Sequence, residues 1–88
     1  MALLIKKFGG TSVEDITKIK AIAQSIIQSK EAGNDIVVVV SAMGHSTDHL
    51  NKLAESISKN PNSRELDMLL STGEQVTMAL LSMSLNEY

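Results

Sequence analysis

The run Ile36-Val37-Val38-Val39-Val40 decides the fold of this chain. All five side chains are apolar and β-branched, and no polar residue interrupts them. The run is too short for a buried helix, and it lacks the polar alternation of a strand with one solvated face. Continuous runs of this kind are typical of strands covered on both faces, as in parallel sheets. The sequence therefore predicts an α/β fold with a buried strand at this position.

The segment before this strand predicts another strand and a helix. Residues 3–8 are short and mostly apolar, and Gly9-Gly10 follows at once, which indicates a strand stopped by a turn. Apolar residues then recur at steps of three and four, as in an amphipathic helix. They are Ile16, Ile19, Ile22, Ala23, Ile26 and Ile27. The order strand, helix, strand predicts one right-handed βαβ unit.

Residues at both ends of the first helix indicate where it begins and where it ends. Ser12, with Asp15 three residues later, is a variant of the capping box, so Ser12 marks the expected start. Glu14 and Asp15 would then lie in the first turn, where the helix dipole favours negative charge. Lys30 lies near the far end, and Gly33 is expected to close the helix in a left-handed conformation.

The second half of the chain predicts mainly helix. A polar turn covers residues 41–48, and an amphipathic stretch follows it and runs to Ile57. The polar segment 59–63, which contains the only proline, ends that helix. Residues 64–88 are typical of a helix interrupted near Ser71-Thr72-Gly73.

Two strands alone leave such a fold incomplete. A two-stranded sheet exposes unpaired backbone groups at both edges and is not stable without good cover. We therefore expect residues 1–88 to be the N-terminal part of a larger α/β domain. Alone, the chain should aggregate or depend on a partner.

Composition argues against several classes of protein. The chain has 88 residues, of which 43% are hydrophobic and 20% charged, so wholesale disorder is not expected. The net charge of −2 argues against a nucleic-acid-binding surface. The absence of cysteine excludes disulfides, and two histidines make a poor zinc site. No apolar run reaches the roughly 18 residues of a membrane span, and the N-terminus does not have the order of a signal peptide. We expect a cytoplasmic protein with neither a nucleic-acid nor a membrane partner.

The first segment that could carry chemistry is Lys7-Phe8-Gly9-Gly10-Thr11-Ser12. Glycines let the backbone approach an anion, and the following helix N-terminus presents unpaired N–H groups. Lys7 could reach the same phosphate. The spacing matches neither GxxxxGK[ST] nor GxGxxG, so a tight turn with a helix cap is the alternative.

The second segment, residues 41–48, lies at the carboxyl end of the buried strand, where ligands bind in open α/β sheets. The hydroxyl groups of Ser41, Ser46 and Thr47 suit a carboxylate or a phosphate. The alternative is that Thr47 only caps the next helix. The two histidines, His45 and His49, are expected to face solvent.

The third segment is Ser71-Thr72-Gly73-Glu74-Gln75. Ser71 with Glu74, or Thr72 with Gln75, fits a capping box and would explain the segment structurally. A functional Glu74 would instead direct its carboxylate at a cationic group such as an amine. We interpret most of the methionines as adaptable core residues rather than ligands. They include Met43, Met68, Met78 and Met83.

Taken together, the three segments closely resemble the N-terminal part of the aspartate kinase (aspartokinase) family. The residues that carry the resemblance are Lys7 to Val13, Val37 to Met43 and Arg64 to Gln75. The likeness covers essentially all 88 residues in order, and KFGGTS followed by STGEQ is a specific combination. It implies the amino acid kinase fold, an αβα sandwich around a mainly parallel sheet, here truncated to its N-terminal segment.

The resemblance also implies an activity. Aspartate kinases transfer the γ-phosphoryl group of Mg-ATP to the β-carboxylate of L-aspartate. The product is 4-phospho-L-aspartate, and the reaction opens the pathway to lysine, threonine and methionine. On matching positions, Lys7 would be the catalytic cation that neutralises the phosphoryl group in transfer. Phe8, Gly9 and Gly10 would form the ATP phosphate site with it, and the resemblance assigns no residue of this chain to a metal.

The aspartate side of the site is implied in the same way. Thr47 and Glu74 would hold L-aspartate, with Glu74 facing its α-ammonium group, and Ser41 would lie beside the substrate. We therefore expect the Lys7 ammonium and the Glu74 carboxylate to share one pocket. Should the two groups lie on opposite sides of the molecule with no cavity between them, the kinase interpretation would fail.

The sequence departs from the resemblance at two points. Glu14 and Asp15 stand where many members carry small residues, and two added carboxylates would weaken phosphate binding. The family's catalytic-site aspartate, adenine pocket and effector-binding ACT domains also lie beyond Tyr88. We therefore expect the 88-residue chain alone not to be a competent kinase, and the full-length enzyme to be a homo- or hetero-oligomer.

Two alternatives remain open at this stage. Another amino acid kinase, acting on glutamate, acetylglutamate, carbamate or UMP, would share the fold. A non-catalytic α/β module used for assembly or regulation would belong to a different class.

Overall fold

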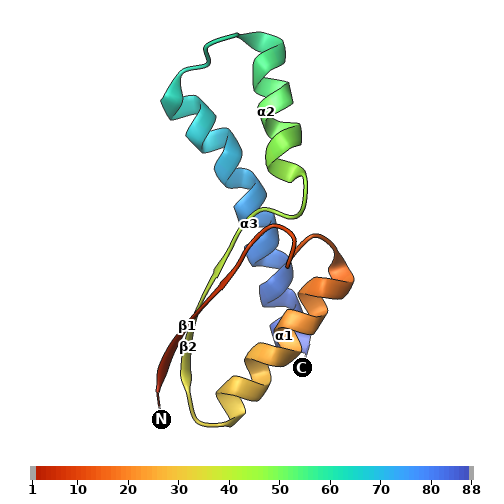
Figure 1. Ribbon diagram of the computed structural model, residues 1–88, viewed down its shortest axis with the longest axis vertical. Helices are drawn as coiled ribbons and strands as arrows, with labels where there is room; N and C mark the ends of the chain where they lie inside the picture. The colour runs from red at the N-terminus through yellow and green to blue at the C-terminus, as the bar shows by residue number, and fades with distance from the viewer. Residues whose placement is uncertain (1, 88) are drawn as a thin grey trace.

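The chain folds into two parallel strands and three helices (Figure 1). The computed structural model describes residues 2–87. In chain order the elements are β1 (Leu3–Phe8), α1 (Ile16–Glu31), β2 (Asp35–Val40), α2 (Ser46–Ile57) and α3 (Ser63–Glu87). The strands pair in register from Leu3 with Asp35 to Phe8 with Val40. The predicted α/β class and the strand–helix–strand order are confirmed.

The molecule is elongated, with extents of 49 × 24 × 19 Å. Figure 1 shows the sheet, α1 and the second half of α3 in its lower part, and the hairpin of α2 and α3 in its upper part. The two parts meet where the strands end and α3 passes them. This junction is where the candidate site lies.

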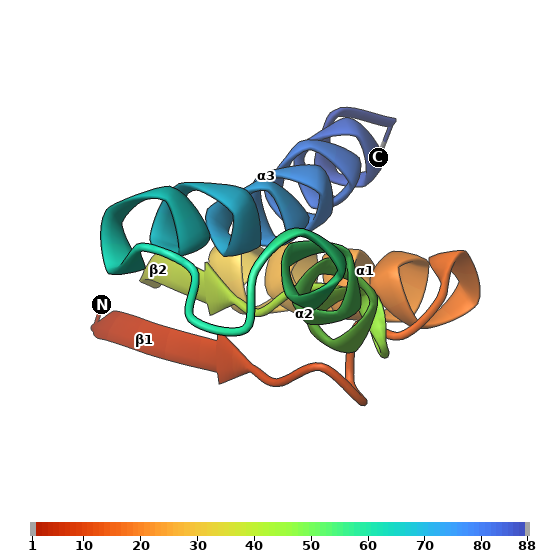
Figure 2. The ribbon, with the colours of Figure 1, turned by 90° about the horizontal axis from the view of Figure 1, so that it is seen from above.

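Both α1 and α3 cover the same face of the sheet (Figures 1 and 2). The strand residues that face them are partly or fully buried, and they pack against the apolar stripe predicted for α1. The core residues are Val13, Ile19, Ile22, Ala23, Ile26, Val40 and Leu81, with Phe8, Ile36 and Val38 packed against them. Burial of this apolar surface is the main force that holds the strands and helices together.

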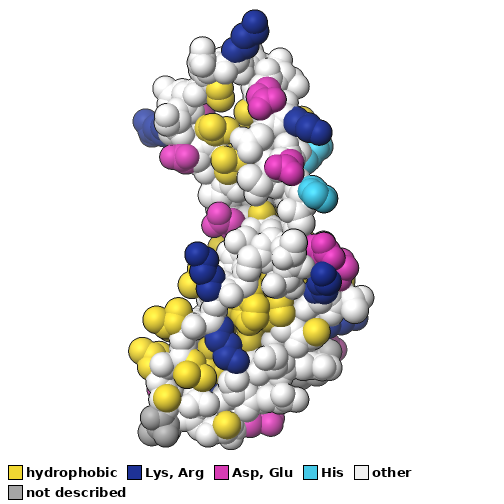
Figure 3. All heavy atoms as spheres, viewed as in Figure 1, with side chains coloured by type: hydrophobic (Ala, Val, Ile, Leu, Met, Phe, Trp, Pro, Cys, Tyr) yellow, Lys and Arg dark blue, Asp and Glu magenta, His cyan; other side chains and the backbone are white. Residues whose placement is uncertain are grey.

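The opposite face of the sheet is open. Leu3, Ile5, Val37 and Val39 lie on it, and their side chains are 46–71% exposed. Hydrophobic side chains gather at this side of the lower part in Figure 3. The prediction that the valine run is covered on both faces is therefore wrong for residues 2–87, because both helices that pack on the sheet lie on its other face.

Helix α1 begins later than the sequence suggests. Ser12 does not cap it, because the helix begins only at Ile16; the Ser12 N–H donates to the Gly9 carbonyl in a turn, at 3.0 Å. Asp15 is the cap residue, and its Oδ1 accepts from the Lys18 N–H at 2.9 Å. Glu14 and Asp15 thus precede the first turn. Gly33 has the expected left-handed conformation, with φ of 96°.

Replacing Asp15 with alanine should destabilise the chain by about 0.5–2 kcal/mol, because it removes the acceptor for one free N–H of α1. Urea unfolding followed by circular dichroism measures this loss. Asp15→Asn keeps an acceptor oxygen and is the matched control. Equal unfolding midpoints for Asp15→Ala and the unchanged chain would contradict the cap.

Helix α3 is continuous, so the predicted interruption near residues 71–73 is wrong. The hydroxyl groups of Ser71 and Thr72 donate to carbonyls three residues earlier, Met68 and Leu69, at 2.8 and 2.6 Å. These bonds engage both hydroxyls inside the helix. They also exclude the capping-box interpretation, which requires a helix to begin there.

The methionines also differ from the prediction. Of the four methionines named above, Met43 packs against the core, whereas Met68, Met78 and Met83 are 50–65% exposed along α3. Over residues 2–87, none of the helices is both long enough and apolar enough to cross a membrane.

Candidate functional site

The two strands end side by side and send two loops out from one edge of the sheet. Phe8 pairs with Val40 in the last register position, and the Ser41 N–H donates to the Phe8 carbonyl at 3.1 Å. Beyond the sheet, the Gly44 N–H donates to the Gly10 carbonyl at 3.1 Å. The first and second candidate segments are therefore tied together by their backbones.

The glycine loop leaves open space beside its backbone. A Cβ atom placed on Gly9 would meet no atom within 4 Å, and one on Gly10 would only touch carbonyls at 3.5 Å. Neither glycine has a positive φ, whereas Gly44 in the second loop does, at 46°. The loop at Gly9 and Gly10 is thus accessible to a ligand, and Gly44 allows the turn that joins the two loops.

Lys7 and its neighbour Lys6 point to opposite faces of the sheet. The Lys6 ammonium donates to Ser29 Oγ of α1 at 2.7 Å, on the covered face. Lys7 is paired in register with Val39 and is exposed on the open face. Among residues 2–87, its ammonium pairs with no carboxylate. Lys7 is therefore free to meet an anion at the end of the strand.

The N-terminus of α2 has no side-chain cap. The cap position is His45, which makes no capping hydrogen bond, and Thr47 is exposed in the first turn. The interpretation of Thr47 as a helix cap is therefore wrong. The first N–H groups of a helix attract anions. This end of α2, together with half-buried Ser41, suits a carboxylate.

The histidines do not contribute to this anion-attracting end. The side chain of His45 is 98% exposed, and it lies 3.5 Å from an oxygen of Asp48. His49 is exposed as well, so both histidines face solvent as predicted. Within residues 2–87, no three His, Asp or Glu side chains gather in a group that could hold a metal ion.

The third segment meets the other two through Gly73. A Cβ on Gly73 would lie 3.0 Å from Ala42 Cβ and 3.8 Å from Ser46 Cβ. Gly73 is buried, and the adjacent Glu74 is exposed on α3. The loop after β2, the start of α2 and the middle of α3 thus converge at Ala42, and Gly10 lies against the same residue.

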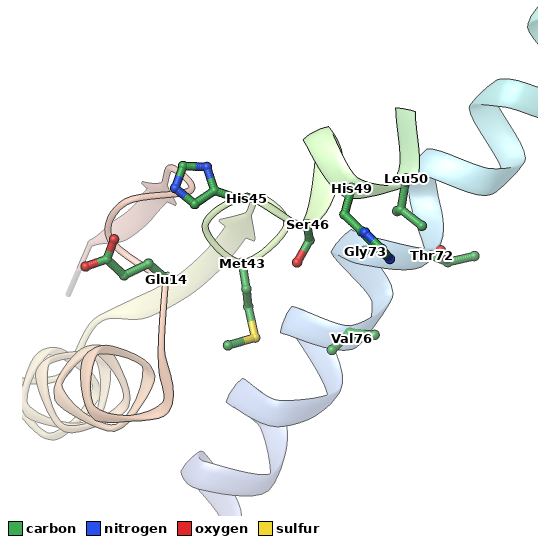
Figure 4. Close-up of a pocket in the computed structure, with 9 residues that line it drawn as sticks. All are labelled: Glu14, Met43, His45, Ser46, His49, Leu50, Thr72, Gly73 and Val76. Atoms are coloured by element: carbon green, nitrogen blue, oxygen red, sulfur yellow. The ribbon is translucent and has the colours of Figure 1, made fainter. Parts of the chain in front are cut away.

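A cavity of about 530 Å³ lies beside this junction (Figure 4). Its lining is mainly apolar, and the Met43 and Ser46 side chains point into it. The residues around it are Glu14, Met43, His45, Ser46, His49, Leu50, Thr72, Gly73 and Val76. Neither Lys7 nor Glu74 lines this cavity or the three smaller ones described.

The expected pocket shared by Lys7 and Glu74 is therefore not formed by residues 2–87. Both side chains are exposed, and Lys7 lies on the face of the sheet that no helix of these residues covers. Their segments meet at one edge of the sheet, where Gly10 and Gly73 both lie against Ala42. Sequence reasoning did not identify Gly73 and Ala42 as the contact, although a glycine within a helical stretch was a signal for it.

The carboxylates of Glu14 and Asp15 have structural roles. Asp15 caps α1, and Glu14 accepts from the Lys18 ammonium at 2.6 Å. That hydrogen bond raises the pKa of Lys18. Figure 4 shows the Glu14 carboxylate directed away from the cavity. Both negative charges thus have partners on or beside α1.

The family model for the amino acid kinase family matches residues 2–88. The chain belongs to the amino acid kinase family. Relatives of this amino acid kinase chain include the aspartokinase of Geobacillus stearothermophilus and aspartokinase 2 of Bacillus subtilis, each 58% identical over 87 residues. These alignments cover 99% of the chain and 21% of each relative. The chain therefore spans about a fifth of the length of the curated relatives it matches.

A solved structure supports the same placement of the elements. The aspartate kinase from Synechocystis superposes on this amino acid kinase chain with a TM-score of 0.95 at 60% sequence identity. The superposition covers 97% of the chain and 14% of the Synechocystis protein. The predicted resemblance to aspartate kinases and the predicted fold are confirmed.

Proposed function

We propose that this chain forms the part of an aspartate kinase that receives the ATP phosphates and holds L-aspartate. In the reaction, an oxygen of the aspartate β-carboxylate attacks the γ-phosphorus of ATP. The bond from that phosphorus to the β,γ-bridging oxygen breaks, so that ADP leaves and 4-phospho-L-aspartate forms. This product would feed the synthesis of lysine, threonine and methionine, and the full-length enzyme would be an oligomer.

The observation that carries the proposal is the meeting of all three segments at Ala42. Gly10 of the glycine loop and Gly73 of α3 both lie against this residue, which is the second residue after β2. A site for two substrates needs groups from several elements at one place, and the carboxyl edge of a parallel sheet is where such sites form. The aspartokinase relatives support aspartate as the acceptor.

Each proposed residue role is the one that the resemblance implies, and the charge and position of the residue support it. Lys7, unpaired by any carboxylate of residues 2–87, would offset the negative charge of the phosphates beside the accessible backbone of Phe8, Gly9 and Gly10. Phosphoryl transfer depends on positioning and charge neutralisation more than on covalent help from the protein. Mg²⁺ would enter bound to the ATP phosphates and would supply further positive charge there.

L-aspartate would be bound by groups that attract its carboxylate and by a group that attracts its ammonium. The uncapped start of α2, with Thr47, would receive a carboxylate of aspartate, and Ser41 would add a hydroxyl group. Glu74 is exposed beside the junction and would accept from the α-ammonium group. The start of α2 and the acid at Glu74 would thus orient a substrate that carries both signs of charge.

A chimeric enzyme tests the proposal. In it, this chain replaces the 87 matched residues of the Geobacillus stearothermophilus aspartokinase. We expect the chimera to release ADP when L-aspartate is added, and to prefer aspartate over glutamate, acetylglutamate, carbamate and UMP. A folded chimera that releases no ADP with aspartate would contradict the proposed function.

In that chimera, Glu74→Gln should raise the KM for aspartate about 10- to 100-fold, because a charge-assisted hydrogen bond to the ammonium group is lost. The KM for ATP should change little. Steady-state kinetics with each substrate varied in turn measures both constants. Glu65→Gln removes an exposed carboxylate from the first turn of the same helix and is the matched control. Equal changes in both KM values for Glu74→Gln would point to a structural role instead.

A further inference from the structure

Helix α3 approaches the loop after β2 most closely at Gly73. A Cβ on this residue would stand 3.0 Å from Ala42 Cβ and 3.5 Å from Leu50 Cδ1. Carbon atoms that are not bonded prefer about 3.5–4.0 Å. Any side chain at position 73 would therefore push α3 away from Ala42 by a few tenths of an ångström. The absence of a side chain lets the helix lie at its present depth.

Helix formation gives no reason for a glycine at this position. Glycine is a poor residue for a helix interior, and alanine is the best one. Gly73 lies near the middle of the 25-residue helix α3 and is buried. Its presence is therefore explained by the close packing against Ala42 and not by the local conformation.

The buried face of α3, which includes Gly73, sets the rotation of the helix about its axis. Gly73, Thr77 and Leu81 are the buried residues of α3, spaced four apart on one face. The Thr77 hydroxyl group is fully buried and donates to the Gly73 carbonyl at 3.3 Å. Depth and rotation of the helix together determine where the residues beside Gly73, above all Glu74, stand relative to the other two segments.

We propose that Gly73 is a positioning residue for substrate binding, which rests on the proposed function of Glu74. Its contact with Ala42 holds the Glu74 carboxylate at the right distance from the segments that carry Ser41 and Thr47. A displacement of the helix changes the geometry of every bond that Glu74 makes to the ammonium group of aspartate. A misplacement of about 1 Å can cost about 100-fold in rate, so a shift of a few tenths of an ångström is enough to weaken the use of aspartate measurably.

The test uses the chimera described above and a double-mutant cycle. Gly73→Ala should raise the KM for aspartate about fivefold or more, with a change in the KM for ATP below about twofold. Ala42→Gly removes the opposing methyl group, so Ala42→Gly/Gly73→Ala should restore the KM for aspartate to within about twofold of the starting value. Ser82→Ala, at an exposed position of the same helix, is the control for an added helix-forming residue.

The outcomes separate the two proposals. An active chimera in which Gly73→Ala leaves the KM for aspartate unchanged would overturn the positioning role alone. So would a loss in kcat or melting temperature with both KM values unchanged, or a double variant that shows no rescue. A folded chimera with no aspartate-dependent activity would contradict the proposed function itself.

Discussion

Lys7→Ala is expected to lower kcat of the chimera about 100-fold or more, which corresponds to about 3–4 kcal/mol for the loss of one electrostatic stabiliser. The attack of a carboxylate on a polyphosphate is opposed by repulsion between negative charges. A lysine about 4 Å from the reacting group contributes about 4 kcal/mol of attraction at an effective dielectric constant near 20, before desolvation is subtracted. Kinetics at saturating ATP and aspartate measures the loss.

Lys6 provides the matched control for this prediction. It has the same side chain one position earlier, but its ammonium group donates to Ser29 on the covered face of the sheet. Lys6→Ala should therefore affect stability slightly and leave kcat within about threefold of the unchanged chimera. A Lys7→Ala variant whose kcat also stays within that range would refute the catalytic role of Lys7.

The second large effect is on stability. Ile19→Ala should lower the free energy of unfolding by about 2–5 kcal/mol, because it leaves a cavity in the core. Ile19 is 1% exposed and packs in the cluster that joins α1 to the sheet. Native proteins are stable by only about 5–15 kcal/mol, so this loss is a large part of the total. Urea unfolding of the chimera, followed by circular dichroism, measures the change.

Ile16→Ala is the control that shows whether burial causes the loss of stability. It belongs to the same helix, one turn earlier, and it is 46% exposed. Ile16→Ala removes the same atoms, but it should cost about 1 kcal/mol or less because little buried volume is lost. Equal losses for the two variants would show that helix propensity or the unfolded state, and not the core, sets the stability.

Much of the fold could be predicted because its elements have strong local patterns. The valine run, the isoleucine stripe of α1 and the turn at Gly33 each have one dominant interpretation. The start of α1 was harder, because Ser12 and Asp15 are both good caps. The turn from Gly9 to Ser12 and the burial of Val13 decide between them, and both are properties of the folded chain.

The continuity of α3 is a second feature that the sequence did not predict. Ser71, Thr72 and Gly73 are all weak helix formers, so local propensity indicated a break. In the structure the two hydroxyl groups bond to carbonyls of the preceding turn, and the glycine fits a tight contact with Ala42. Tertiary packing thus outweighs a preference that the sequence shows clearly.

The motifs name candidate site residues, but they do not give their arrangement. They point to Lys7, Thr47 and Glu74 as candidates, and the comparisons agree with the family that the motifs indicate. The contact between Gly73 and Ala42 depends on how α3 crosses the sheet edge, which no local pattern records. The pocket walls that Lys7 and Glu74 would share are not supplied by residues 2–87.

Because α3 is long, a small tilt about its contact at Gly73 would move its far end noticeably. From Gly73 to the start of the helix at Ser63 the rod extends roughly 15 Å, at 1.5 Å per residue. A tilt of about 4° around Gly73 would carry that far tip through about 1 Å while hardly moving the pivot itself. A push on the α2–α3 tip would therefore reach the junction mainly as a small rotation of α3 about Gly73.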